Sequence, residues 1–150
     1  MIRLTIATLA IAASAGVAWA AVSGAEAIKE RRQLMKIDGE VSKPIVPMMK
    51  GTVPFDLATV QKALRTYEDA AQKELALFPP DSKTGDTNAL PAIWEGDNKA
   101  DFDARLKKFG EDARAALASV KDEASFKAIM PAFYEKNCGG CHEKYKAKQQ

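Results

Sequence analysis

Apolar residues recur along this chain at intervals of three, four and seven positions, the spacing that gives an α-helix one apolar face. Four segments show this spacing, and helix-breaking residues separate them. They span about residues 25–42, 55–77, 101–120 and 122–146. Strand-like alternation is not found between them. The pattern therefore predicts an all-α fold in which four helices pack as an antiparallel four-helix bundle.

The two middle segments carry the clearest apolar stripes. In the second segment the stripe consists of Val60, Leu64, Tyr67, Ala71, Leu75 and Phe78. In the third it consists of Phe102, Leu106, Phe109, Ala113, Leu117 and Val120. We expect both stripes to face the core of the bundle, with Gly110 as a tolerated weak point of the third helix.

Prolines are expected to disturb the regular geometry of the first and last helices. Pro44 and Pro47 are predicted to interrupt or kink the end of the first helix, because proline lacks the backbone N–H that a helix interior needs. Met48 and Met49 would then lie outside the regular helix. Pro131 falls inside the last segment, where we expect a kink or a late helix start.

Residues 79–98 are rich in proline and glycine and show no sustained period, so we expect a crossover loop between the second and third helices. Leu90, Ile93 and Trp94 are apolar enough to dock this loop on the bundle.

The first twenty residues read as a secretory signal peptide. Arg3 precedes an apolar run, and Ala18-Trp19-Ala20 matches a signal-peptidase cleavage site. The run is short and no stop-transfer flank follows it, which argues against an uncleaved anchor. We expect cleavage after residue 20, a mature domain of residues 21–150, export to the periplasm and no stable membrane insertion.

Size and charge restrict the class of protein. The mature chain of about 130 residues suits one domain. Lysine and arginine total 22 against 20 aspartate and glutamate, for a net charge of +2, and the two signs are interleaved. This balance argues against a nucleic-acid partner.

Chemistry concentrates in Cys138-Gly139-Gly140-Cys141-His142, which holds both cysteines and the single histidine of the chain. C-x-x-C-H attaches haem c: the two thiols form thioethers and the histidine that follows binds the iron. A structural disulfide would close a very small loop with little stabilisation. A thioredoxin-like pair would need a βαβ setting, and zinc would need further ligands. The motif predicts one covalent haem c on Cys138 and Cys141, with His142 as the proximal axial ligand.

The second axial position is open in the sequence. No other histidine exists and both thiols are used, so a methionine sulfur is the protein ligand to expect if there is one. Met130 shares a helix with His142 and would not reach the opposite face of the haem. Met35, Met48 and Met49 remain, although methionines at helical spacing are often core residues.

The chain resembles the cytochrome c′ family, the class II cytochromes c, over essentially all of its mature length. The matching segments are Ala27-Ile28-Lys29-Glu30-Arg31, Met49-Lys50-Gly51, Pro54-Phe55-Asp56, Leu75 to Pro79, Leu90-Pro91-Ala92-Ile93-Trp94, and Cys138 to His142 with Tyr145 and Lys146. The resemblance implies a bundle that encloses the haem, with a residue of the first helix over the buried face of the iron.

That residue is Met35, four positions after Arg31. Five-coordinate members of the family carry leucine or phenylalanine there, so methionine is similar to the low-spin cytochrome c-556 type and implies a Met35 distal ligand. By the same resemblance Arg31 would lie near the haem propionates and Lys146 near the proximal face. A solvent-exposed role is the alternative for both, and Arg32 is the rival of Arg31.

Aromatic residues add a further expectation. Phe78, Trp94, Phe133 and Tyr145 are candidates for porphyrin contact, although aromatic residues at these spacings are more often ordinary core residues.

Two functions follow as expectations. The first is periplasmic electron transfer through a six-coordinate His/Met haem, with redox partner proteins that the sequence does not identify. The second is a five-coordinate haem that binds nitric oxide or carbon monoxide. An enzymatic role such as a peroxidase is disfavoured, because the chain has no second histidine for acid–base work. Family members often form homodimers through the first two helices, so a homodimer is possible here.

Overall fold

The protein is described here by a computed structural model that covers residues 22–148. The predicted signal peptide, residues 1–20, lies outside this range. The described elements are α1 (Gly24–Met49), α2 (Leu57–Glu74), η1 (Pro80–Ser82), η2 (Pro91–Trp94), α3 (Asn98–Ser119), α4 (Glu123–Tyr134), η3 (Glu135–Gly139) and α5 (Gly140–Tyr145). The two short elements η1 and η2 are 3-10 helices, whereas η3 is a π-helical turn.

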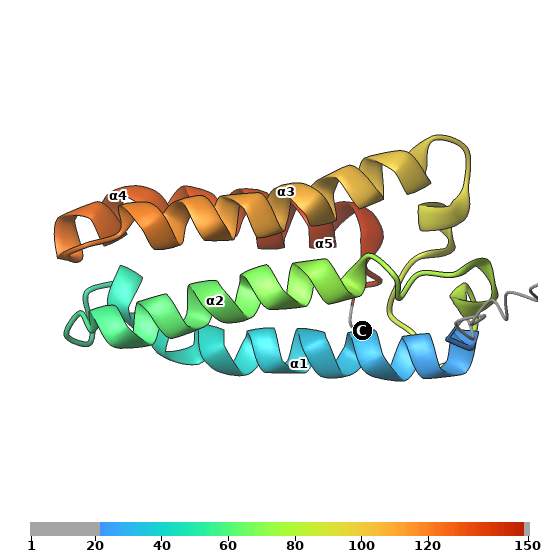
Figure 1. Ribbon diagram of the computed structural model, residues 1–150, viewed down its shortest axis with the longest axis horizontal. Helices are drawn as coiled ribbons and strands as arrows, with labels where there is room; N and C mark the ends of the chain where they lie inside the picture. The colour runs from blue at the N-terminus through green and yellow to red at the C-terminus, as the bar shows by residue number, and fades with distance from the viewer. Residues whose placement is uncertain (1–21, 149–150) are drawn as a thin grey trace, which may run out of the picture.

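The long helices alternate in direction and form an antiparallel four-helix bundle (Figure 1). α4, η3 and α5 follow one another directly, so together they make the fourth rod of the bundle. The loop of residues 75–97 closes the end of the bundle opposite the α1–α2 and α3–α4 connections (Figure 1). The prediction of an all-α four-helix bundle is confirmed.

Side-chain caps fix where the helices begin. The Ser23 hydroxyl accepts a hydrogen bond from the Glu26 N–H at the start of α1. Asp56 accepts from two N–H groups at the start of α2, and Asp122 forms a capping box with Ser125 at the start of α4. Each cap satisfies N–H groups that have no partner within the helix, which stabilises the boundary.

The end of α1 differs from the prediction, because the helix continues through Pro44 and Pro47 to Met49. The φ angle of proline suits a helix, but each proline removes one backbone hydrogen bond and its ring crowds the carbonyl four residues earlier. Ile45 and Met48 are buried in the core on this stretch, and their packing offsets that cost. Met48 and Met49 therefore belong to the helix rather than to an irregular segment after it.

Pro131 also lies within a helix. α4 starts at Glu123, so the proline does not delay it, and the departure from α-helical geometry comes later, at η3. There the Gly140 N–H bonds to the Glu135 carbonyl, five residues back, as a π-turn requires.

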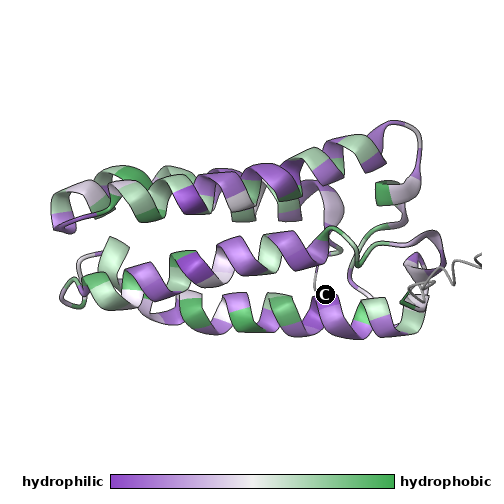
Figure 2. Cartoon of the chain, viewed as in Figure 1, coloured by the Kyte–Doolittle hydropathy of each residue, from purple (hydrophilic) through white to green (hydrophobic). Residues whose placement is uncertain are grey.

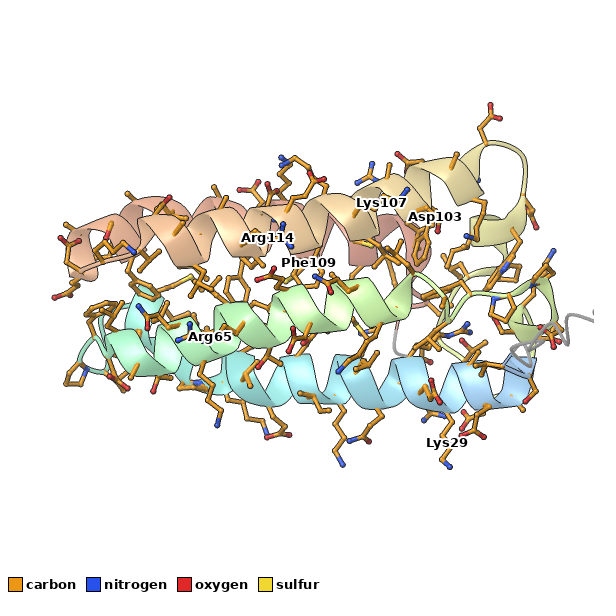
Figure 3. The ribbon with its side chains drawn as sticks, in the orientation of Figure 1. Lys29, Arg65, Asp103, Lys107, Phe109 and Arg114 are labelled. Atoms are coloured by element: carbon orange, nitrogen blue, oxygen red, sulfur yellow. The ribbon has the colours of Figure 1, made fainter. Side chains whose placement is uncertain are left out.

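Two groups of buried residues flank an open region in the bundle. The larger cluster includes Ile45, Val60, Leu64, Tyr67, Phe109, Phe126, Met130 and Phe133. The smaller cluster consists of Ile93, Phe102, Leu106 and Tyr145. Apolar and polar stretches alternate along each helix, as the predicted stripes require (Figure 2). Phe109 points from α3 towards α2, whereas Lys29 points away from the bundle (Figure 3).

The crossover loop is ordered by contacts with the bundle. Ile93 is buried in the smaller cluster, and the Trp94 indole N–H donates to the Phe78 carbonyl at 3.1 Å. Further along, the Leu90 N–H donates to the Tyr145 carbonyl at 2.9 Å, which ties the loop to the end of α5. The predicted docking of the loop is thus confirmed. Within residues 22–148, none of the helices combines the length and apolar character needed to cross a membrane.

Candidate functional site

A cavity of about 600 Å³ lies between the two clusters. This volume falls in the range of about 300–1,000 Å³ typical of small-molecule and cofactor sites. Its apolar wall is formed by Phe78, Ile93, Phe102, Leu106, Phe109 and Tyr145. Polar side chains from α1, α2 and the C-terminal rod complete the lining.

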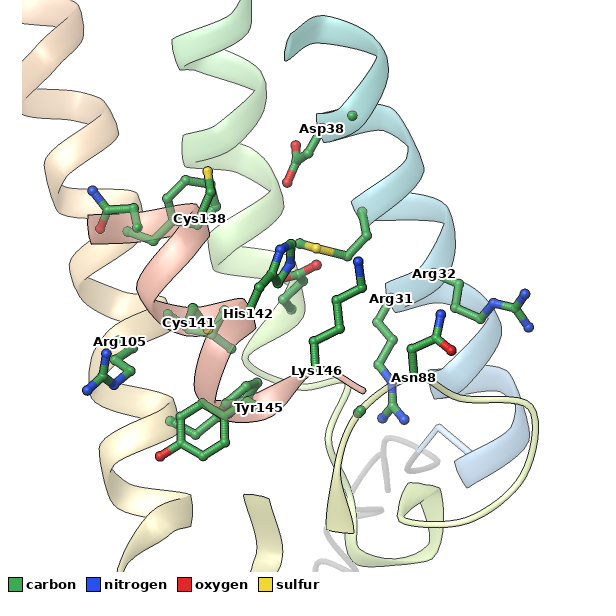
Figure 4. Close-up of a pocket in the computed structure, with 18 of the residues that line it drawn as sticks. Arg31, Arg32, Asp38, Asn88, Arg105, Cys138, Cys141, His142, Tyr145 and Lys146 are labelled. Carbon is green, nitrogen blue, oxygen red and sulfur yellow. The ribbon is translucent and has the colours of Figure 1, made fainter. Parts of the chain in front are cut away.

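Cys138, Cys141 and His142 all line this cavity. Their i, i+3, i+4 spacing places them on one face of the C-terminal rod, which crosses from η3 into α5. Figure 4 shows the three residues on successive turns, facing Asp38 and Arg31 of α1 across the cavity. The motif is thus presented to a cavity of cofactor size.

The two thiols are not those of a redox pair. Both are free, and burial raises the pKa of Cys138 to about 11 and raises that of Cys141 above its usual value. Disulfide oxidoreductases need the opposite shift, because the thiolate is the nucleophile. No group of three metal-ligating side chains occurs in the described part of the chain, which also argues against a zinc site there.

His142 has the protonation state that an iron ligand needs. Partial desolvation at the cavity lowers the pKa of its imidazole, although the residue is partly open to solvent, and the nearby Lys146 charge lowers it further. The ring is therefore neutral at pH 7, with a lone pair available for a metal.

Met35 lines the same cavity from α1, whereas the cysteines line it from the C-terminal rod. The other methionines of residues 22–148 do not line it: Met48 and Met130 are buried in the larger cluster, and Met49 packs on that cluster. Met35 is 38% exposed, so its side chain is not needed as a core filler.

Arg31 lies one turn before Met35 and is only 4% exposed, which excludes a solvated surface role. Its guanidinium donates to the Leu77 carbonyl (3.0 Å), the Ser82 hydroxyl (2.8 Å), the Ser82 carbonyl (3.0 Å) and the Thr87 hydroxyl (2.7 Å). It also stacks over the Phe78 ring at 4.5 Å. These four bonds use both terminal nitrogens fully and leave one donor, the Nε–H, for another acceptor.

The remaining residues that the sequence singled out are two basic residues, Lys146 and Arg32, and four aromatic residues. Lys146 lines the cavity beside His142, and its backbone pairs with Ala89 of the loop. Arg32 is exposed and pairs with Asp86 of the loop. Among the aromatic candidates, Phe78 and Tyr145 line the cavity, whereas Trp94 and Phe133 stand behind its wall.

Two carboxyl groups in the lining escaped the sequence analysis. Asp38 is 8% and Glu74 is 2% exposed. Neither Asp38 oxygen, nor Oε1 of Glu74, has a hydrogen-bond donor among the described residues. Burial raises the pKa of Asp38 to about 7, and burial together with the Asp38 charge raises that of Glu74 to about 8. Their sequence positions are ordinary polar positions of amphipathic helices, so periodicity alone carries no signal for them.

A hydroxyl chain lies next to these carboxyls. The Tyr67 hydroxyl is 2.7 Å from the Ser42 hydroxyl and 2.6 Å from the Tyr134 hydroxyl, and Ser42 donates to the Asp38 carbonyl at 2.6 Å. Burial raises the pKa of both tyrosines, so the chain is neutral at all ordinary pH values. It joins α1, α2 and α4 at the wall of the cavity.

Comparison with known proteins accounts for this arrangement. The family model described as Cytochrome C′ matches residues 26–146. A Rhodopseudomonas palustris cytochrome c′ is 45% identical over 98% of this chain and 99% of its own length. A cytochrome c-556 of Agrobacterium fabrum is 36% identical over 86% of each chain. The solved structure of R. palustris cytochrome c′ superposes with a TM-score of 0.77 at 46% identity, covering 83% of this chain and 98% of that one.

The residues of the cavity fit a haem. The volume of the cavity and its aromatic wall suit a flat apolar ring, while two protonated thiols and a neutral imidazole lie on one face of the rod that borders it. Only the unpartnered Asp38 and Glu74 are not explained by such a ring. With the fold, the motif and the matched length in agreement, the chain belongs to the cytochrome c′ family, whose cofactor is one covalently attached haem c.

Proposed function

We propose that this protein is a periplasmic electron carrier whose haem c is bound to Cys138 and Cys141 and has His142 and Met35 as its two axial ligands. The observation that carries the proposal is that Met35 and His142 reach one cavity from α1 and α5. The haem supplies the redox chemistry, because its iron accepts and returns one electron.

The side chains of the site suit this role. The neutral imidazole of His142 and the thioether of Met35 are both uncharged ligands, and a His/Met pair raises the reduction potential of a haem. With both axial positions occupied by the protein, no position is left for a substrate. Since His142 is the single histidine, the site also has no imidazole for acid–base catalysis, and we propose no enzymatic activity.

Location and partners belong to the same proposal. The export signal predicted in residues 1–20 supports a periplasmic location. His142 lines the cavity and is exposed to solvent, so a redox partner protein would approach there. Ile37 on α1 and Val53 between α1 and α2 are exposed apolar residues, which supports a homodimer through the first two helices. Analytical ultracentrifugation of the holoprotein tests the dimer.

A five-coordinate haem that binds nitric oxide or carbon monoxide is the second candidate. It is favoured by the exposure of Met35, which is absent from both buried clusters and so is not locked in one position by packing. The relative that is 45% identical is also named a cytochrome c′, whereas the one named cytochrome c-556 is 36% identical.

The absorption spectrum of the purified holoprotein separates the two. The carrier proposal predicts low-spin bands and a methionine-to-iron charge-transfer band in the ferric protein. Met35→Leu should convert the haem to a high-spin form that binds carbon monoxide in the ferrous state. Met49→Leu is the matched control, because Met49 lies on the same helix but outside the cavity, and its spectrum should not change. A wild-type protein that is already high-spin and binds carbon monoxide readily would refute the carrier proposal.

A further inference from the structure

Glu74 is a buried acid without a bonded partner. It lies at the last turn of α2, lines the cavity and is 2% exposed. Its Oε1 atom has no hydrogen-bond donor among residues 22–148. An ionised carboxylate in such a place loses its hydration without compensation, so the side chain favours the protonated form.

The buried cation of the cavity does not neutralise Glu74 by direct contact. Arg31 exerts an attractive charge effect on Glu74, but its two terminal nitrogens are committed to Leu77, Ser82 and Thr87. No ion pair within 4.0 Å joins Arg31 and Glu74. The Arg31 charge thus lowers the pKa of Glu74 without a direct bond. The desolvation of Glu74, which raises this pKa, is the larger effect.

Several other ionisable groups face the same cavity. They are Arg32, Lys36 and Asp38 of α1, Tyr67 of α2, Arg105 of α3, Tyr134 of α4, Cys138 of η3, Cys141, His142 and Tyr145 of α5, and Lys146 after it. Asp38 and Arg31 are the charges that act on Glu74. Asp38 is less buried than Glu74, and an ionised Asp38 would repel a negative charge on Glu74. A proton on Glu74 removes this repulsion between the two carboxyl groups.

We propose that Glu74 is a proton-binding site coupled to reduction of the haem: the carboxylate takes up one proton when the iron takes up one electron. The electron comes from a one-electron donor protein and converts ferric to ferrous iron, and the proton comes from solvent and forms the O–H bond of the Glu74 carboxylic acid. Oxidation releases both. This coupling rests on the redox cycling in the proposed function, but not on Met35 as a ligand.

The physical reason is electrostatic. Reduction of a haem held in this cavity would remove one positive charge from a place lined by buried groups, where charges interact more strongly than in water. An added negative charge favours protonation of a nearby acid. Proton uptake on reduction makes reduction harder as the pH rises, so the midpoint potential must fall with pH between the oxidised-state and reduced-state titrations of Glu74.

The test is the midpoint potential of the holoprotein as a function of pH, from about pH 5 to about pH 10. The steepest part of the wild-type curve should approach a tenfold change in the reduction equilibrium per pH unit, which is about 59 mV for one electron. In Glu74→Gln this slope should fall to less than half of the wild-type value. Glu68→Gln is the matched control: Glu68 lies on the same helix, outside the cavity and paired with Arg114, so the slope should be unchanged.

Three results would overturn the assignment. They are a wild-type potential that is flat over this range, an undiminished slope in Glu74→Gln, and a slope lost in Asp38→Asn but retained in Glu74→Gln. The absorption spectrum reports axial ligation separately, so a five-coordinate haem would contradict the carrier proposal without affecting this measurement.

Infrared spectroscopy keeps the proposal testable in wild-type protein if Glu74→Gln does not fold. The reduced-minus-oxidised difference spectrum should contain the C=O band of a newly protonated carboxylic acid. This band should shift when the protein carries ¹³C-labelled glutamate, which assigns it to a glutamate rather than to Asp38, and Glu74 is the glutamate among the described residues that line the cavity. If the band did not shift with the glutamate label, or if no such band appeared, the assignment of the proton to Glu74 would be wrong.

Discussion

The hydrogen bonds of Arg31 are expected to contribute most to holding α1 against the crossover loop, and the substitution Arg31→Met tests this. The substitution keeps an apolar side chain against Phe78 but removes four hydrogen bonds of 2.7–3.0 Å to Leu77, Ser82 and Thr87. Two of the acceptors are backbone carbonyls of the segment that follows α2.

The magnitude follows from those contacts. Leaving a buried acceptor unsatisfied costs about 1–3 kcal/mol. Some of the three residues that accept these bonds will find water as the loop relaxes, so we expect a net loss of about 3–5 kcal/mol in the free energy of unfolding. For a domain of this size, about 1 kcal/mol corresponds to roughly 4 °C, so the midpoint of thermal unfolding should fall by about 10–20 °C.

Urea unfolding of the holoprotein, followed by circular dichroism, measures the change. The matched control is Arg32→Met, because Arg32 is the neighbouring residue and forms only an exposed pair with Asp86. The control should lose about 1 kcal/mol or less. If Arg31→Met were no less stable than Arg32→Met, the anchoring role derived from the four bonds would be wrong.

Three further variants test other parts of the structure by urea unfolding. Tyr67→Phe removes the hydroxyl that joins Ser42 and Tyr134, and should cost about 1–2 kcal/mol; no loss would mean that the hydroxyl chain does not hold the helices together. Gly24→Ala would place a Cβ against the backbone of η1 and should cost about 1–3 kcal/mol, whereas an unchanged stability would contradict that close approach. Burial raises the pKa of Glu74 to about 8, so the contribution of its protonated form is fully present below about pH 4 and is lost as the pH rises towards 8. The wild-type protein should therefore lose stability relative to Glu74→Gln over that range, and a constant difference would contradict the raised pKa.

Helical periodicity predicted the architecture and most of the core. The stripe from Phe102 to Val120 faces inwards on α3, because a 3.6-residue repeat leaves little choice of face once helices pack. The attachment motif was equally readable, since C-x-x-C-H places its three functional groups on one helix face whatever the surroundings.

The features that were missed depend on contacts distant in sequence. Asp38 and Glu74 occupy polar positions that any helix surface tolerates, and only the packing of α1 against α2 buries them. Arg31 was expected near a haem propionate, but the partners that the structure adds lie 46 to 56 positions away. Pro44 was expected to disturb α1, and the helix survives because of burial that no local rule describes.

The central claim is that Met35 and His142 bind the haem iron from opposite sides. The most direct measurement is the absorption spectrum of the ferric holoprotein beside that of Met35→Leu. The account predicts a low-spin spectrum with a methionine-to-iron charge-transfer band that disappears in the variant. A low-spin spectrum that is unchanged in Met35→Leu, or a high-spin spectrum in the wild type, would contradict it.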